Sequence, residues 1–149
     1  MISNLENQLK LFNKYKSTNE SGGPINKKDM FEWIINFDGP IDSDYEGGKF
    51  HVKVKFDDKN YEKRPLCKFL SGDLLHPNIT DKGDVCFGTN FPWTKESTIF
   101  DILNALYFLL KNPNFGDGYD NQQVKDFYDS DPVAYHRTVK EIVKEFHQK

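Results

Sequence analysis

The first sixteen residues place apolar side chains at the spacing of an amphipathic helix. Leu5, Leu9 and Phe12 recur at intervals of four and three, and lysines and a glutamate occupy other positions of the helical wheel. This pattern predicts a helix over residues 3–16. Residues 17–24 are rich in turn formers and include Ser-Gly-Gly-Pro, so they are predicted to form a loop.

After residue 29 the apolar period changes from that of a helix to that of a strand. Apolar side chains alternate in residues 31–37 and, more regularly, in residues 50–56, which predicts two strands. A shorter apolar run, residues 66–70, predicts a third strand whose inward and outward positions remain open. Such alternation is typical of an antiparallel sheet with one solvated face. The expected outward residues of the second strand make that face basic: Lys49, His51, Lys53 and Lys55.

Three helices are predicted in the C-terminal half. The longest begins at Ser97 or Thr98, and Asp101 is suitably placed for a capping box with Thr98. Its wide apolar stripe should be buried on most sides against the sheet. Residues 121–129 are expected to form a short helix, and Asp131-Pro132 is a strong start signal for the last one. The expected docking stripe of this last helix consists of Tyr135, Val139, Ile142 and Phe146. The order of elements predicts one α+β domain over residues 1–149, with helices gathered around three or four antiparallel strands.

Composition excludes several classes of function. The net charge is −3, whereas a general nucleic-acid-binding domain is usually basic, so no nucleic-acid partner is expected. Neither a long apolar run nor a signal-peptide pattern is present, which favours a cytosolic or nuclear protein without membrane contact. The two cysteines are expected to be thiols rather than a disulfide. The spacing of Cys67, His76 and Cys86 does not match a zinc site, so no metal is expected.

Residues 74–93 differ from the regular elements on either side because they are rich in turn residues and contain a potential nucleophile. Cys86 follows a turn at residues 81–84 that would expose it, although a lone cysteine is more often a small buried hydrophobe. The only base nearby in sequence is His76, so the pattern does not indicate a protease-type Cys–His pair. Such a thiol suits carrying an acyl group as a thioester. The side-chain amide of Asn78, eight residues earlier, is a suitable donor to an oxyanion.

These features together resemble the ubiquitin-conjugating enzymes, and the resemblance extends over essentially the whole chain. The most specific signature is His76-Pro77-Asn78 followed by Cys86. The other residues that carry the resemblance are Phe31-x-Trp33, Gly39-Pro40, Ser43, Tyr45-Glu46-Gly47-Gly48-x-Phe50, Tyr61, Pro65, Ile79, Gly83-x-Val85, Trp93-x4-Thr98-Ile99 and Asn112-Pro113-Asn114. The resemblance implies the UBC fold: an N-terminal helix, a four-stranded antiparallel meander, an active-site loop segment and three helices.

The resemblance also implies roles for individual residues around the cysteine. Cys86 would receive ubiquitin or a related modifier from an activating enzyme as a thioester and pass it to a lysine of a protein substrate. Asn78 would stabilise the oxyanion or hold the active-site loop, with His76 and Pro77 as structural supports. Asp117 would be the acidic gate for the incoming lysine, although it could equally be a solvated loop carboxylate.

Partner surfaces follow from the same resemblance, and no cofactor is implied. Lys10 and Lys14 on the first helix, which chemistry alone would leave as a solvated face, would dock the activating enzyme. The basic outer face of the second strand matches a place where family members bind a second ubiquitin without a covalent bond.

The chain departs from the common family pattern at its ligase-facing positions. Lys63 stands where an apolar residue is usual, and Thr94-Lys95-Glu96 replaces Ser-Pro-Ala. Phe87-Gly88 replaces the common Leu-Asp after the cysteine, so a nearby acidic residue is missing. Lys63 and Lys95 therefore predict atypical ligase docking. A different ubiquitin-like modifier is an alternative to ubiquitin, and a non-catalytic ubiquitin-binding variant is a further one.

Overall fold

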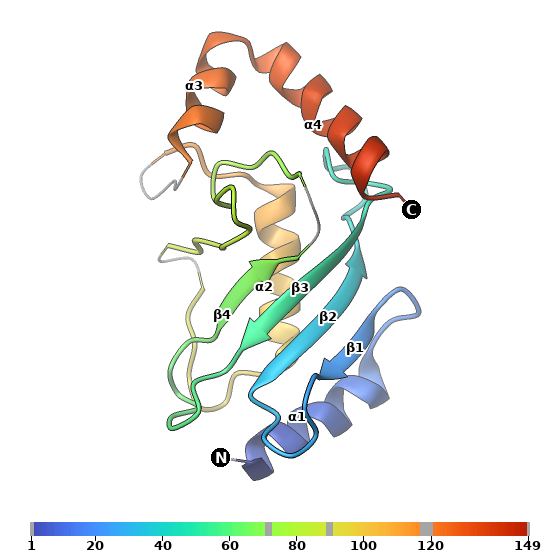
Figure 1. The fold of residues 1–149 in the computed structure, drawn as a ribbon, viewed down its shortest axis with the longest axis vertical. Coiled ribbons are helices and arrows are strands. Elements are labelled where there is room, and N and C mark those ends of the chain that lie inside the picture. Colours follow the sequence, from blue (N-terminus) through green and yellow to red (C-terminus); the bar gives the residue numbers. More distant parts are fainter. Residues whose placement is uncertain (1, 71–72, 89–90, 117–120, 149) are drawn as a thin grey trace.

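The fold is built on one antiparallel sheet in which the strands neighbour each other in the order of the sequence, β1-β2-β3-β4. The structure is a computed structural model, and it describes residues 2–70, 73–88, 91–116 and 121–148. The elements, in chain order, are α1 (Ile2–Tyr15), β1 (Ser21–Pro24), β2 (Glu32–Asp38), β3 (Lys49–Lys55), β4 (Leu66–Phe69), α2 (Ile99–Lys111), α3 (Gln122–Ser130) and α4 (Pro132–Phe146). This arrangement confirms the predicted α+β class and four-stranded meander (Figure 1).

The register of β2 against β3 brings the predicted inward side chains together on one face. The opposed pairs are Trp33 with Val54, Ile35 with Val52, and Phe37 with Phe50, and all six residues are buried. Full burial of a large apolar side chain stabilises a fold by roughly 1.5–3 kcal/mol, so these pairs form much of the core. The strand β4 continues the alternation, with Cys67 and Phe69 buried and Leu66 and Lys68 exposed.

The strand β1 corrects the prediction that residues 17–24 form only a loop. Ser21–Pro24 pairs antiparallel with residues 33–36 of β2 at the edge of the sheet. Gly22 has φ +122°, and a Cβ at this position would lie 2.0 Å from the carbonyl oxygen of Ile34. The glycine therefore permits close pairing with β2 rather than a turn, and Pro24 is tolerated because edge strands need fewer donors.

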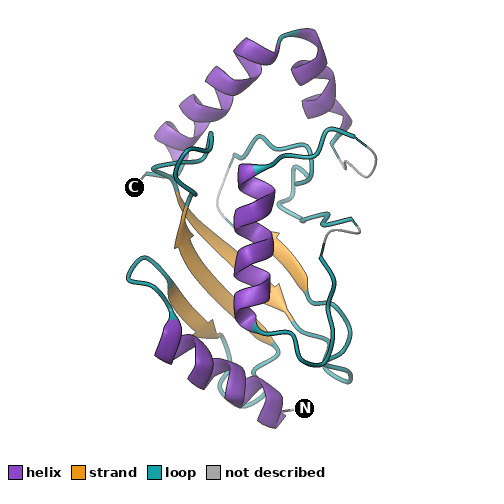
Figure 2. Ribbon diagram, turned by 180° about the vertical axis from the view of Figure 1, so that it is seen from behind, coloured by secondary structure: helices purple, strands orange, loops and turns teal. Residues whose placement is uncertain are grey.

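The helix α2 covers the inner face of the sheet, as the view from behind shows (Figure 2). Thr98 is its N-cap and forms the predicted capping box with Asp101. The buried stripe consists of Ile99, Ile102, Leu103, Leu106, Leu109 and Leu110, although Phe108 is exposed. The N–H of Ile99 donates to Oε1 of Gln8 at 2.8 Å and so ties α1 to the start of α2.

The helices α3 and α4 lie together at the end of the molecule opposite α1 (Figure 1). Asp131 is the predicted N-cap of α4, and its side chain accepts a hydrogen bond from the N–H of Ala134. The docking stripe differs from the prediction, because Val143 is buried whereas Phe146 is 45% exposed. Beyond the helix, the carbonyl of His147 accepts a hydrogen bond from the N–H of Lys49, which joins the end of α4 to β3.

A search of the described part of the chain for membrane-spanning helices found none of sufficient length and apolar character.

Candidate active site

A short hairpin places Cys86 beside the outer edge of β4. The turn closes because the N–H of Gly83 donates to the carbonyl of Thr80 at 2.9 Å and the N–H of Thr80 donates to that of Asp84 at 2.9 Å. The N–H of Phe69 then donates to the carbonyl of Gly83 at 2.8 Å, and that of Val85 to the carbonyl of Cys67 at 3.1 Å. The rigid sheet therefore fixes the segment immediately before Cys86.

Gly83 is required by this docking. Its φ is +93°, and a Cβ added there would lie 2.1 Å from the carbonyl oxygen of Phe69. L-residues with a side chain are disfavoured at such φ values, and the contact is with backbone rather than with a movable side chain. Gly83 therefore shapes this loop, because the hairpin can approach β4 only where residue 83 has no side chain.

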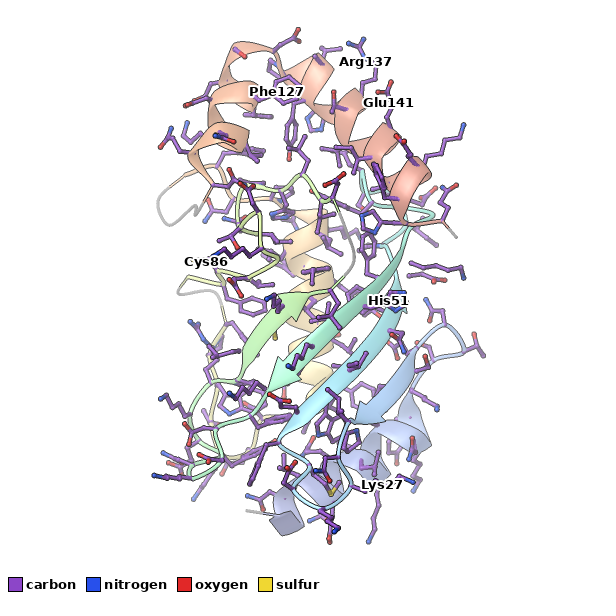
Figure 3. All side chains as sticks on the ribbon, viewed as in Figure 1. Lys27, His51, Cys86, Phe127, Arg137 and Glu141 are labelled. Carbon is purple, nitrogen blue, oxygen red and sulfur yellow. The ribbon has the colours of Figure 1, made fainter. Side chains whose placement is uncertain are left out.

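Cys86 is joined to Asn78 through the backbone. The N–H of Cys86 donates to the carbonyl of Asn78 at 2.8 Å, immediately beyond the Ile79–Val85 bridge. The cysteine is partly exposed, and it lies among the loops beside β4 (Figure 3). The two residues of the sequence signature are therefore neighbours, with a thiol that a partner can reach.

The side chain of Asn78 points inward and binds the segment after α2. Its Oδ1 accepts from the N–H of Asn114 at 2.8 Å, and its Nδ2 donates to the carbonyl of the same residue at 3.0 Å. Only 1% of Asn78 is exposed. One amide thus satisfies both backbone groups of Asn114 and fixes the distance between the Cys86 hairpin and the loop that follows α2.

His76 links the same loop to α2. Its Nε2 donates to the carbonyl of Leu109 at 2.8 Å, and its Nδ1 accepts from the N–H of Asn78 at 3.0 Å. An Nδ1 that accepts a hydrogen bond carries no proton, so the ring is neutral with the proton on Nε2. Burial lowers the pKa of His76 to about 4, despite the opposing effect of the Leu109 carbonyl. The ring also packs 5.6 Å from that of Tyr45.

Asn121 completes the support from the far side. Its N–H donates to the carbonyl of Pro77 at 3.0 Å, and its side chain caps α3 by accepting from the N–H of Val124. Sequence reasoning did not identify Asn121 or Asn114 as parts of this site. Asn114 is part of the Asn112-Pro113-Asn114 motif of the family resemblance, and Asn121 stands before a short predicted helix, where asparagine is a common N-cap. Neither pattern indicates that these residues bond to the loop around Asn78.

The other cysteine provides a contrast within the same chain. Cys67 is buried in β4, and burial raises the pKa of its thiol to about 12, although Arg64 acts in the opposite direction. Since the thiolate is the nucleophilic form of cysteine, the environment of Cys67 is that of an inert core residue.

Aromatic side chains hold the segment that follows Cys86. Phe87 and Phe91 are buried, with ring centroids 4.7 Å apart, and Phe91 contacts Trp93 at 5.7 Å. The indole Nε1 of Trp93 donates to the carbonyl of Tyr61 at 2.7 Å. The segment after the cysteine is therefore packed onto the loop that precedes β4.

The remaining residues singled out from the sequence lie on the surface or outside the described residues. Lys10 and Lys14 are exposed on α1, and Lys63 and Lys95 are exposed in two loops. Lys63 has its Nζ 3.6 Å from a carboxylate oxygen of Asp57. Asp117 lies outside the described residues.

The described ranges contain no group of three or more His, Cys, Asp or Glu side chains able to hold a metal ion. The chemistry that this arrangement offers is that of a partly exposed thiol on a braced hairpin, flanked by buried amide and imidazole groups. Such an arrangement suits acyl transfer through sulfur.

Comparisons with known proteins show the family of the chain. The sequence model of the family described as ubiquitin-conjugating enzyme matches residues 4–143. The chain is 31% identical over 124 residues to ubiquitin-conjugating enzyme E2 13 of Arabidopsis thaliana, covering 74% of each chain. It is 29% identical over 139 residues to ubiquitin-conjugating enzyme E2 7 of the same plant, covering 84% of this chain and 83% of that protein.

A viral protein is similar over a still larger share of the chain. The probable ubiquitin-conjugating enzyme E2 L460 of Acanthamoeba polyphaga mimivirus is 26% identical over 147 residues, which cover 96% of this chain and 92% of that protein. The chain therefore belongs to the ubiquitin-conjugating enzyme family.

Proposed function

We propose that the chain accepts ubiquitin from an activating enzyme as a thioester on Cys86 and transfers it to a lysine amine. In the first step the Cys86 thiolate attacks the carbonyl carbon of the activating enzyme's thioester, a new S–C bond forms, and the activating enzyme's thiolate leaves. In the second step a neutral lysine amine attacks the same carbonyl, the Cys86 thiolate leaves, and the amine loses a proton to solvent or a base. The observation that carries this proposal is the hydrogen bond from the N–H of Cys86 to the carbonyl of Asn78, which is 2.8 Å long. It makes the residue with the partly exposed thiol a neighbour of the residue with the buried side-chain amide.

Asn78 is proposed to hold the active-site loop and, through its second N–H, to serve the oxyanion. The loop role is supported by the pair of bonds to Asn114, 2.8 Å and 3.0 Å long. The Nδ2 group has two N–H bonds, and one of them is used for Asn114. The loop role uses Oδ1 and one N–H of the amide, and the oxyanion role would use the other N–H, so one side chain can serve both roles.

His76 and Pro77 are proposed to be structural. Both ring nitrogens of His76 are engaged, and its lowered pKa leaves a weak base, which argues against general-base catalysis. The carbonyl of Pro77 accepts from the N–H of Asn121 and so joins the loop to α3. Asp117 is proposed, from the family resemblance, as the acidic gate for the attacking lysine.

The identity of the modifier and ligase is proposed from the surface. Ubiquitin is the favoured modifier, with the activating enzyme docking on Lys10 and Lys14. The exposed cations Lys63 and Lys95 favour a ligase with atypical, charged contacts. The same charged surface motivates the second candidate, conjugation of another ubiquitin-like modifier.

The experiment incubates the chain with ATP and either ubiquitin or another ubiquitin-like modifier, each with its own activating enzyme. We expect an adduct with ubiquitin that disappears on addition of reductant. A reductant-sensitive adduct formed only with another modifier would select the second candidate. If no modifier forms an adduct, the proposed transferase function is wrong and the non-catalytic alternative gains support.

A further inference from the structure

Arg64 bonds to the backbone that follows the cysteine. Its Nη1 donates to the carbonyl of Gly88 at 2.9 Å and to that of Phe91 at 3.4 Å. Its guanidinium carbon also lies 5.9 Å from the centroid of the Phe91 ring, within the range of a cation–π contact. Three contacts from one side chain thus converge on Gly88 and Phe91, which lie two and five residues after Cys86.

These contacts have a geometric consequence because Arg64 lies next to β4. Pro65 is buried and leads directly into the strand, so the Arg64 backbone is anchored to the sheet. Before Cys86, the same strand holds the chain through the Val85 N–H and the Cys67 carbonyl, 3.1 Å apart. The cysteine is therefore tied to one end of β4 from both directions in sequence.

Apolar packing holds the side chains after the cysteine, whereas Arg64 bonds to the backbone carbonyl of Gly88. Phe87 turns inward against Phe91, which fixes side chains but satisfies no backbone acceptor. Gly88 has φ +60°, and a Cβ there would meet no atom within 4 Å, so packing does not constrain this residue. The guanidinium supplies a charge-assisted bond at the point where apolar packing ends.

The geometry points to Arg64 as a positioning residue for the transfer step: its guanidinium holds the carbonyls of Gly88 and Phe91 and so orients the thioester on Cys86 for the incoming amine. This role rests on the proposed thioester function. Reacting groups must be held within narrow limits for transfer, and displacements of about 1 Å can cost roughly a hundredfold in rate. Arg64 does not touch the reacting atoms, and it acts only through the segment that it holds.

The test compares Arg64→Ala, Arg64→Lys and the matched control Lys59→Ala. Lys59 is an exposed cation of the same loop whose backbone N–H bonds Asp57 at 3.0 Å, so its removal changes the charge equally. Each chain is charged, separated from the activating enzyme, and discharged to free lysine over a range of lysine concentrations. We expect Arg64→Ala to lower the maximal discharge rate about five- to tenfold, with the half-saturating lysine concentration unchanged.

The lysine variant separates the effect of the positive charge from that of the guanidinium group. A lysine keeps the positive charge, but its side chain is one bond shorter and lacks the planar guanidinium that contacts both carbonyls and the Phe91 ring, so Arg64→Lys should restore only part of the rate. A full restoration would mean that charge alone matters, which would overturn the proposed role of the guanidinium group. A discharge rate for Arg64→Ala within about twofold of that of Lys59→Ala would overturn the proposal altogether.

Amide hydrogen exchange gives a readout that needs no modifier. The N–H of Cys86 is bonded to Asn78, and we expect Arg64→Ala to accelerate its exchange while that of Thr80, in the hairpin before the cysteine, stays constant. Unchanged exchange at Cys86 would contradict the positioning role. If the native chain forms no thioester, the transferase proposal fails, and the exchange result alone still decides whether Arg64 positions this segment.

Discussion

The two sides of Cys86 are held by different physical means. On the side before the cysteine, buried polar groups of His76 and Asn78 bond to backbone at Leu109 and Asn114. On the side after it, aromatic rings pack together and the exposed guanidinium of Arg64 bonds to two carbonyls. Unsatisfied buried polar groups are costly, so the first side tolerates little change, whereas apolar packing adapts more readily.

The largest effect is expected from Asn78→Ala, which removes the side-chain amide that bonds to Asn114 on the side before the cysteine. Charging of Cys86 should persist, whereas discharge to lysine should slow about a hundred- to thousandfold, as for loss of one oxyanion donor. Single-turnover assays of each step measure this difference. Asn112→Ala, which removes an exposed amide whose Nδ2 donates to the Phe108 carbonyl at 3.1 Å, is the matched control.

An equal loss of charging and discharge in Asn78→Ala would count against both roles of this residue. The loop and oxyanion roles are distinguished by amide exchange at Cys86, whose N–H bonds to the backbone carbonyl of residue 78, a group that the alanine variant retains. Rapid exchange there would accompany loss of the loop contact. Slow discharge with protected exchange would favour a direct effect on the oxyanion.

Two glycine substitutions compare the two sides under the same chemical change. Gly83→Ala should lower the free energy of unfolding by about 3 kcal/mol, because the new Cβ meets the Phe69 carbonyl at 2.1 Å in a left-handed backbone. Gly88→Ala meets no atom within 4 Å, so only the backbone strain of about 1 kcal/mol is expected. Denaturant unfolding measures both values, and equal losses would contradict the difference between the two sides.

The third prediction concerns the pH dependence of stability. The pKa of His76 is lowered from 6.5 to about 4 in the folded chain, so below pH 6.5 the unfolded chain binds a proton that the folded chain does not. The contribution of neutral His76 to the free energy of unfolding should therefore be fully present above pH 6.5. It should be lost as the pH decreases toward 4, which lowers the free energy of unfolding by roughly 2–3 kcal/mol. Urea unfolding of the native chain and of His76→Gln isolates this contribution, since the variant has no titrating ring. Parallel pH profiles for the two chains would disprove it.

The smallest effect on thioester discharge is expected from Trp93→Phe, which tests the side after the cysteine. Loss of the indole bond to Tyr61 should lower the free energy of unfolding by about 1–2 kcal/mol, while discharge of the thioester changes by less than about twofold. Trp33→Phe is a matched control in the core, because its indole donates to the Met30 carbonyl at 2.9 Å. If Trp93→Phe impaired discharge as strongly as Asn78→Ala, the proposed difference between the two sides would be wrong, because the aromatic side would then be equally important for transfer.

Local signals explain what the sequence could predict. Thr98 and Asp101 are three residues apart, and Asp131 precedes a proline, so both helix starts were visible in the printed sequence and are confirmed. The alternation in β3 likewise identified its buried side chains correctly. The strand β1 was missed because Ser-Gly-Gly-Pro is typical of a turn, and only contact with Ile34 makes Gly22 part of a sheet.

The hydrogen bonds that hold the site could not be predicted from local sequence patterns, because they join residues that are distant in sequence. Asn78 and Asn114 are 36 residues apart, and Arg64 and Gly88 are 24 apart. No periodicity encodes such pairs, which exist only once the sheet and α2 have brought the loops together. The sequence could therefore indicate Cys86 and Asn78 as candidates, but not the bonds that hold them.

The most direct test of the central claim is the mass and chemical stability of the adduct formed by the native chain, Cys86→Ser and Cys67→Ser. The account predicts that the native chain and Cys67→Ser gain one modifier that reductant removes. Cys86→Ser should gain none, or one held by an oxygen ester that resists reductant. A reductant-labile adduct that persists in Cys86→Ser and disappears in Cys67→Ser would contradict the assignment of Cys86 as the acyl carrier.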